Sequence, residues 1–532
     1  MKLREADWLA LLLMAVCVVL GIASHNALNP DGVSYLDLAA RVSAGDWSHF
    51  VQGYWSPLYP MIIAIGAMLT GREGPALIGM VHLINTLIAI LGVGVIWSIA
   101  RRNGNAVFGR SAFAAYLVCS AEAPRLEAVT PDLLLMVFVS MIGSELLFFS
   151  GQRWFRLGLL MGLAFLAKTS MWPWLLAAVV IRLVVSRQRA GVSVVMKSAA
   201  ICAVIMLFWL IPLGWRSGKL TFGSAAPLNA CWYMRECDSR SPDSHSGAHR
   251  QYQSIVAGAS QATVATFSGT PWTYLPWSDP TEWAAGVITA RRVTPTLGQH
   301  LLYSAKQLLL VVGIWMPHIW LGILLPIAWI YRRRGMWREL RDARRDAGVV
   351  MLLGVIGILE FVPVHVEPRL VAPFILLFTM GALGWLCATP ATKSAPTLAA
   401  ESLSRVVLGL SWLGLVAALP RSAWHARDQW RTAQLTTERR AMITGSEAAR
   451  VAARFGPRRI AVVGEVFPVL TEAYRLGGTI VLQVLRPTVP EILAWPAEDQ
   501  QALVRWVAAQ GATEAWLSKP GGSFSILPLP AR

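Results

Sequence analysis

The stretch WLALLLMAVCVVLGIA, residues 8–23, is followed closely by LNPDGVSYLDLAARVSAGDW, residues 28–47. The first segment is apolar and approaches the length of about 20 residues that a membrane-spanning helix needs. In the second segment, Val33, Leu36, Leu38 and Val42 can form one face of an amphipathic helix. Asp31 therefore stands at the mouth of the first membrane segment. Taken alone, it suits a helix cap after Pro30.

The rest of the chain continues the apolar pattern. It has 532 residues, of which 55% are hydrophobic and 14% charged, with a mean hydropathy of +0.51. Soluble proteins are about 25% charged, so the composition indicates a polytopic α-helical membrane protein. The first apolar run is long for a signal peptide and many more follow, which favours a retained signal-anchor helix.

The charge balance is strongly basic, with a formal net charge of +17. In a membrane protein, lysine and arginine accumulate in cytoplasmic loops, and this explanation is favoured over a nucleic-acid partner. The 24 tryptophans suit membrane interfaces, where the ring is buried and the N–H stays hydrated.

About eleven spans of roughly 17 to 25 residues are predicted. They cover residues 7–25, 77–100, 107–122, 131–149, 156–170, 172–187, 197–215, 306–331, 347–365, 370–388 and 404–420. With the N-terminus inside, every strongly basic loop between them falls on the cytoplasmic side. Apolar length and basic loops therefore predict the same topology.

The outer face then carries most of the polar chain. It holds residues 26–76, 123–130, the turn near Lys168, a long loop 216–305, the junction 366–369 and the C-terminal tail. The short apolar segment 57–71 is predicted to be a helix in or near the outer interface. A span there would invert every later loop.

The tail changes character after residue 420, where strand-like and helix-like segments alternate. This pattern predicts a small extracytoplasmic α/β domain over residues 421–532. Residues 1–420 then form the transmembrane domain. Gly464 follows a strand-like run but lacks a G-x-G-x-x-G, so a packing or capping role is expected in place of a nucleotide site.

The chain contains six cysteines. Cys17, Cys119, Cys202 and Cys387 lie in apolar segments and suit buried small side chains. Cys231 and Cys237 lie in the polar loop, where a disulfide and two free thiols are both open interpretations.

Charged residues of both signs gather on the predicted outer face, where membrane anchoring alone does not explain them. The candidates are Asp31, Asp132, Lys168, Arg369, Arg125, His365 and Glu367, with Tyr54 and Tyr59 as further substrate-binding residues. Singly, the two aspartates suit helix caps, the lysine suits snorkelling, and Glu367 suits a local ion pair with Arg369. Together they fit a site where a carboxylate activates or orients an acceptor while cations hold a phosphate leaving group.

Five segments, in order, resemble the GT-C superfamily of polytopic glycosyltransferases, and in particular the bacterial protein O-mannosyltransferase-like and aminoarabinose-transferase-like enzymes. They are NPDGVSYLDLAARVSAGDW, YWSPLYPMIIAIGAMLTG, TPDLLLM, GLLMGLAFLAKTS and HVEPRLVAPF. The resemblance implies transfer of a sugar from a polyprenyl-phosphate donor to a protein, lipid or envelope glycan. It places the reaction at the outer face of the bacterial cytoplasmic membrane, without a nucleotide sugar or a Rossmann domain.

By this resemblance, Asp31 is the essential acid of the first outer loop and Asp132 the second acid. Lys168 and Arg369 would contact the lipid phosphate. The aromatic residues of the long outer loop would either cover the sugar or form an interfacial belt. They are Trp232, Tyr233, Trp272, Tyr274, Trp277 and Trp283.

Three positions depart from the family pattern. Relatives often have a second acid at the position of Gly32, and aminoarabinose transferases have a lysine where this chain has Ser56. Leu370 stands where relatives often have tyrosine. These departures leave the sugar and the acceptor open.

Two other functions remain in competition. One is a non-catalytic lipid-carrier transporter or flippase, which would carry its charges near the membrane midplane in two similar halves. The other is an inactive GT-C-like assembly subunit. No metal-ligand motif is present, so no cofactor is expected, although a divalent metal is not excluded.

Overall fold

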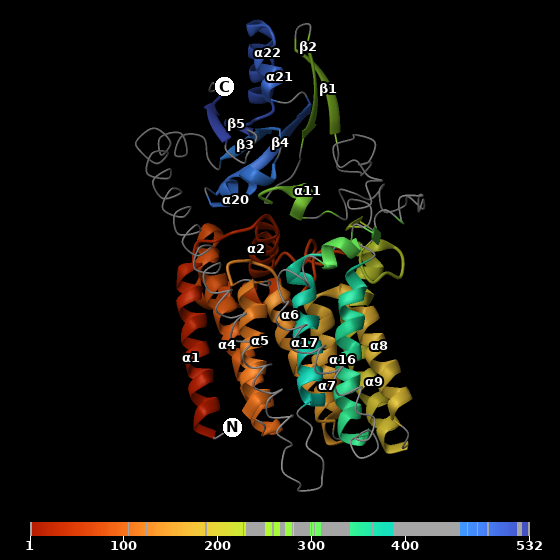
Figure 1. Cartoon of the computed structure of the whole chain (residues 1–532). Helices are drawn as coiled ribbons and strands as arrows, with labels where there is room; N and C mark the ends of the chain where they lie inside the picture. Colours follow the sequence, from red (N-terminus) through yellow and green to blue (C-terminus); the bar gives the residue numbers. More distant parts are fainter. Residues whose placement is uncertain are drawn as a thin grey trace.

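The computed structural model describes residues 3–104, 106–122, 126–149, 151–186, 189–226, 228–229, 251–257, 260–266, 272–278, 280, 298, 301–302, 304–309, 341–362, 366–386, 458–464, 466–475, 477–486, 489–518 and 524–529. These residues form a long helical bundle with a sheet-containing layer at one end (Figure 1).

The bundle is built from apolar helices that run alongside one another (Figure 1). They are α1 (Leu3–Ala23), α4 (Leu77–Asn103), α5 (Ala106–Glu122), α6 (Asp132–Leu147), α7 (Trp154–Ala167), α8 (Trp172–Val185), α9 (Arg189–Ser217), α16 (Arg341–Phe361) and α17 (Pro368–Leu386). In the described part of the chain, four apolar stretches are long enough to cross a membrane. They are Ala6–Ala23, Gly74–Asn103, Gly191–Ser217 and Pro368–Trp385. The chain is therefore a multi-pass membrane protein.

Most of the predicted spans correspond to helices. Every predicted span from 7–25 to 197–215 overlaps a described helix, as do 347–365 and 370–388. Only the first residues of 306–331 are described, and 404–420 lies outside the described residues. The total of eleven spans therefore stays a prediction.

Helices α16 and α17 pack closely against each other. A Cβ atom at Gly354 of α16 would lie 2.6 Å from the backbone nitrogen of Phe378 on α17. A backbone atom cannot swing away as a side chain can, so only glycine allows this approach. At the outer end of the pair, Arg369 lies in the first turn of α17.

Helix α2 (Pro30–Ser43) lies between the bundle and the sheet layer (Figure 1). Its predicted apolar face is buried, and so are Ser34 and Asp37 on other sides of the helix. They are buried because α11 (Leu275–Ser278) and α20 (Phe467–Arg475) also pack against α2. Helix α3 (Leu58–Thr70), the predicted interfacial segment, packs against α2 and α4.

The described strands form one six-stranded sheet in the order β1-β2-β4-β3-β5-β6. They are β1 (Gln251–Ala257), β2 (Ser260–Thr266), β3 (Arg459–Val463), β4 (Thr479–Arg486), β5 (Glu514–Ser518) and β6 (Phe524–Pro528). The inner strands β4, β3 and β5 are parallel, and their neighbours are antiparallel. Helices α21 (Val489–Leu493) and α22 (Ala497–Ala509) precede β5 along the chain.

The hairpin β1–β2 extends this sheet from a distant part of the chain. Its strand β2 pairs with β4, although residues 251–266 fall within the predicted outer loop 216–305 of the transmembrane domain. The sheet is thus assembled from two regions that α16 and α17 separate in sequence.

Direct hydrogen bonds join the sheet layer to the bundle. The hydroxyl of Tyr474 donates to the carbonyl of Gly74 over 3.0 Å, and Arg475 donates to the carbonyl of Asn26 over 2.8 Å. The segment 272–278 lies between the two layers: the backbone carbonyl of Thr273 accepts from Ile480 of β4, while its side chain contacts α2.

Candidate functional site

A network of ion pairs lies at the end of the bundle that faces α2. Its centre is Arg369, whose Nη1 donates to Asp31 Oδ2 over 2.7 Å and whose Nε donates to Glu367 Oε2 over 2.6 Å. The same Nη1 lies 3.9 Å from Asp132 Oδ2, an ion-pair distance. One guanidinium thus gathers three carboxylates from α2, α6 and the entry to α17.

A second cation completes the network. Lys168 follows the last residue of α7, and its Nζ donates to Asp132 Oδ1 over 2.6 Å. Its side chain therefore turns to Asp132 rather than extending only to the membrane surface. Asp132 receives a cation at each of its oxygens, which links Lys168 to Arg369.

Helix geometry explains how the two aspartates reach the site. The N-cap position of α2 is Asn29, whose side-chain oxygen accepts from the backbone N–H of Val129 instead of capping the helix. Asp31 lies within the first turn, so its carboxylate is free to pair with Arg369. Asp132 begins α6, where a negative charge also interacts favourably with the helix dipole.

The carboxylates of the network differ in how exposed their side chains are, and this difference suits them to different roles. The side chain of Asp132 is 2% exposed, whereas those of Asp31, Glu367 and Arg369 are 21%, 30% and 29% exposed. Asp132 therefore suits holding the cations in place. Asp31 and Glu367 are the carboxylates of the network that a reactant can reach.

Two residues near the network did not emerge from the sequence. Tyr35, one turn after Asp31 on α2, is buried, and this burial together with the nearby Asp132 and Asp31 raises the pKa of its phenol. Glu360 on α16 interacts electrostatically with Lys168, and its Oε2 is buried without a hydrogen-bond partner in the described structure. The spacing of four between Asp31 and Tyr35 is the one signal that could have placed Tyr35 there.

The structure gives physical reasons for two departures from the family pattern. At Gly32 a Cβ atom would lie 2.7 Å from the Cβ of Val129, so an acidic side chain has no room. Ser56 accepts a hydrogen bond from the backbone N–H of Thr169 over 2.8 Å, directly beside Lys168. The serine therefore supports the turn that carries Lys168.

The two predicted tyrosines lie near α2 in different surroundings. Tyr59 is fully buried and donates to Asn85 over 2.8 Å. Tyr54 donates to Asn229 over 3.2 Å and packs its ring against Trp55. Of the two, Tyr54 is the more accessible.

The aromatic residues of the long outer loop are described only in part. Trp272 and Tyr274 are buried at the joint between α2 and the sheet, where Tyr274 donates to Gln483 of β4. Trp277 packs against Trp55. These three residues pack between the two layers. The sequence predicted either a cover over the sugar or an interfacial belt, and did not predict this packing role.

Several predicted residues lie outside the described part of the chain. They are Arg125, His365, Cys231 and Cys237, together with Cys387, Trp232, Tyr233 and Trp283. The disulfide and the substrate contacts assigned to them stay predictions. Cys17, Cys119 and Cys202 are buried free thiols, as expected.

Within the described residues, no group of three or more histidine, cysteine or acidic side chains is arranged to hold a metal ion. The carboxylates Asp31 and Glu367 instead meet around the guanidinium of Arg369. The expectation that no cofactor is needed stays a prediction.

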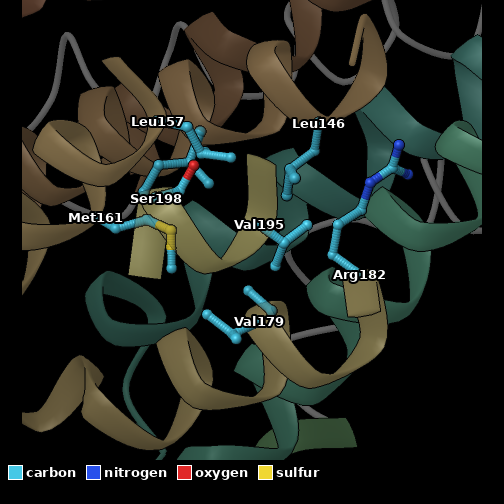
Figure 2. A pocket seen from close by; sticks show the side chains of 9 residues that line it. Leu146, Leu157, Met161, Val179, Arg182, Val195 and Ser198 are labelled. Carbon is cyan, nitrogen blue, oxygen red and sulfur yellow. The ribbon is translucent and has the colours of Figure 1, made fainter. Parts of the chain in front are cut away.

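A small apolar cavity lies elsewhere in the bundle (Figure 2). It is enclosed by α6, α7, α8 and α9, with Leu146, Leu157 and Arg182 among its lining residues (Figure 2). Leu146 is near the end of α6 and Asp132 is at its beginning, so about 20 Å of helix separates them. This cavity is therefore distinct from the ion-pair network.

A known crystal structure has a similar fold. The crystal structure of ArnT from Cupriavidus metallidurans in the apo state matches 97% of this chain and 93% of its own, with a TM-score of 0.54 and 15% sequence identity. The chain has the fold of ArnT. This confirms the GT-C-like, aminoarabinose-transferase-like fold that the sequence resemblance predicted.

A second ArnT structure from the same organism was solved bound to undecaprenyl phosphate. It matches 96% of this chain and 92% of its own, with a TM-score of 0.50 and 15% identity. No protein-family model matches the chain. No curated protein matches it either.

Proposed function

We propose that this chain is a membrane glycosyltransferase that moves a sugar from a polyprenyl-phosphate donor to an acceptor at the outer face of the bacterial cytoplasmic membrane. The observation that carries this proposal is the pairing of Asp31 with Arg369 next to the pair of Asp132 with Lys168. The ArnT fold supports it, because a structure with that fold binds undecaprenyl phosphate.

The donor phosphate would compete with the carboxylates for the two cations. A phosphodiester oxygen near Arg369 takes over the Nη1 donor that Asp31 holds in this structure, since a guanidinium forms strong paired contacts with phosphate. Lys168 adds a second positive charge on the far side of Asp132. Asp132 is a positioning residue that keeps both cations in place.

Release from Arg369 makes Asp31 available as a base. The hydroxyl oxygen or amine nitrogen of the acceptor attacks the anomeric carbon, and the bond from that carbon to the phosphate oxygen breaks. Asp31 takes the acceptor proton, while the electron pair of the broken bond leaves on polyprenyl phosphate. Protonation of Asp31 offsets the additional negative charge on the product phosphate, and the cations stabilise that charge as it develops.

The arrangement also suits a site at a membrane boundary. The residues of the network meet where the bundle ends and α2 crosses it (Figure 1). A polyprenyl chain can then remain among lipid tails while its phosphate reaches the polar end of the bundle. This geometry is less suited to a transporter, which would hold charges near the midplane.

The experiment compares cells that lack the gene with cells that carry the wild-type, Asp31→Asn or Glu73→Gln chain. Glu73 is an exposed acid in the same outer region and serves as the matched control. Mass spectrometry of envelope glycans and lipids should reveal a sugar addition that the wild type and Glu73→Gln restore and Asp31→Asn does not. Full restoration by Asp31→Asn at equal protein level would favour a non-catalytic subunit or transporter.

A further inference from the structure

A second charged cluster lies at the opposite end of the bundle from α2. Glu145, in the last turn of α6, is 2% exposed and lies 3.8 Å from Arg102, 3.6 Å from Arg153 and 3.4 Å from Arg156. Three guanidinium groups therefore surround one carboxylate. The cluster carries a net charge of +2 when all four groups are ionised.

The Glu145 carboxylate does not form ordinary hydrogen bonds with the guanidinium N–H groups of these arginines. All three distances are longer than an ordinary N–H···O hydrogen bond of about 2.7 to 3.2 Å. Glu145 Oε1 is buried without a hydrogen-bond partner among the described residues. Arg102 donates to Ser144, but Arg153 and Arg156 remain 45% and 52% exposed. Their N–H groups can therefore bind an additional anion.

Apolar and aromatic groups adjoin the arginines. Phe155, between Arg153 and Arg156 in sequence, is 54% exposed. Leu157, which follows Arg156, lines the cavity between α6, α7, α8 and α9 (Figure 2). Cationic groups lie over aromatic rings in several pairs at this end, as expected at the level of lipid headgroups: Arg101 over Trp97, Arg102 over Phe148, Arg182 over Phe149 and Lys197 over Trp154.

We infer that Arg102, Arg153 and Arg156 form a binding site for the phosphate of an anionic phospholipid headgroup. Arg153 and Arg156 contact the phosphate, and Arg102 remains fixed by Phe148 and Ser144. The acyl chains extend along the exposed face that carries Phe155. Glu145 holds the three arginines together and keeps their combined charge below +3. This site is separate from the proposed transfer reaction.

The test uses the purified full-length chain in a neutral detergent. Its thermal stability is measured while phosphatidylglycerol, phosphatidylcholine or inorganic phosphate is added. Phosphatidylglycerol should stabilise the wild type, whereas phosphatidylcholine and phosphate at the same concentration should not. Equal stabilisation by phosphate alone would overturn the lipid assignment and indicate a free-anion site.

Charge removal at the cluster is compared with equal charge removal elsewhere on the same face. The double variant Arg153→Gln/Arg156→Gln should bind phosphatidylglycerol about 30-fold more weakly, because each basic side chain near an anionic lipid surface contributes about fivefold. The control Arg101→Gln/Lys197→Gln removes two exposed charges that do not contact Glu145. An equal loss in that control would mean diffuse attraction to the membrane, and the site would be rejected.

A third variant separates lipid binding from a purely structural role. Glu145→Gln removes the acid but keeps the arginines, so its response to phosphatidylglycerol should be as strong as in the wild type or stronger. If the cluster only supports the fold, Glu145→Gln and the double arginine variant should both lower stability and neither should change the lipid response. That outcome would overturn the inference.

Discussion

The Nη1 atom of Arg369 lies 2.7 Å from Oδ2 of Asp31, although 338 positions separate the two residues in the chain. Arg369 lies in the first turn of α17 and Asp31 in the first turn of α2, so the pair joins the last described bundle helix to the helix that crosses the bundle. Each residue alone had a plain structural explanation. Their contact, together with Asp132 and Lys168, is the basis of the proposed active site.

Arg369→Lys should weaken binding of the polyprenyl-phosphate donor at least about tenfold while retaining the positive charge. Arg369 contacts Glu367 through Nε and Asp31 through Nη1, whereas a lysine has one charged nitrogen and cannot place donors at both positions. The measurement is titration of the purified chain with a short polyprenyl phosphate. Arg72→Lys, at an exposed position, is the control, and unchanged affinity in Arg369→Lys would contradict the assigned role.

Lys168→Met should destabilise the folded chain by about 3 kcal/mol, because it leaves the buried Asp132 carboxylate without its nearest cation. The double variant Lys168→Met/Asp132→Asn should recover part of that loss, since no unpaired charge remains. Unfolding in mixed detergent with increasing SDS measures both effects. Additive losses in the double variant would show that the two side chains do not depend on each other.

Asp37 should make stability depend on pH. Burial raises the pKa of its carboxyl from 3.8 to about 6, against the opposing effects of Thr273, Ser278 and Arg41. The folded chain therefore holds a proton that the unfolded chain releases between these values, and stability falls as pH rises from about 4 to about 6.

The Asp37→Asn variant provides the comparison, because its side chain does not titrate. Thermal unfolding at several pH values should show a smaller decline over this range than in the wild type. Tyr474 also lies close enough to Asp37 to interact electrostatically, so Tyr474→Phe is a useful second variant. An identical pH profile in Asp37→Asn would exclude Asp37 as the source.

Gly354→Ala should destabilise the bundle by about 1 to 3 kcal/mol, the usual cost of overpacking. Its Cβ would meet the backbone of Phe378 and push α17 away from α16. Gly94→Ala is the matched control, because a Cβ there has no heavy atom within 4 Å. The control should be neutral or slightly stabilising by helix propensity, and equal losses in both variants would contradict this account.

Local sequence pattern predicted much of the bundle. Apolar length identified α1, α4, α9 and α17, and amphipathic spacing identified α2, because these signals arise within one helix. The strands β3, β4 and β5 were also evident from alternation with helices. The hairpin β1–β2 was not, since its partner β4 lies in a distant part of the chain.

The candidate site shows the same division. The sequence alone determined which charged residues stand at the ends of apolar helices, because a charge placed within a bilayer is costly. The tertiary structure alone decided that Asp132 is buried between two cations and that Asp31 is accessible. Contacts and burial depend on how helices pack across hundreds of residues, whereas hydropathy and helical periodicity are properties of neighbouring residues.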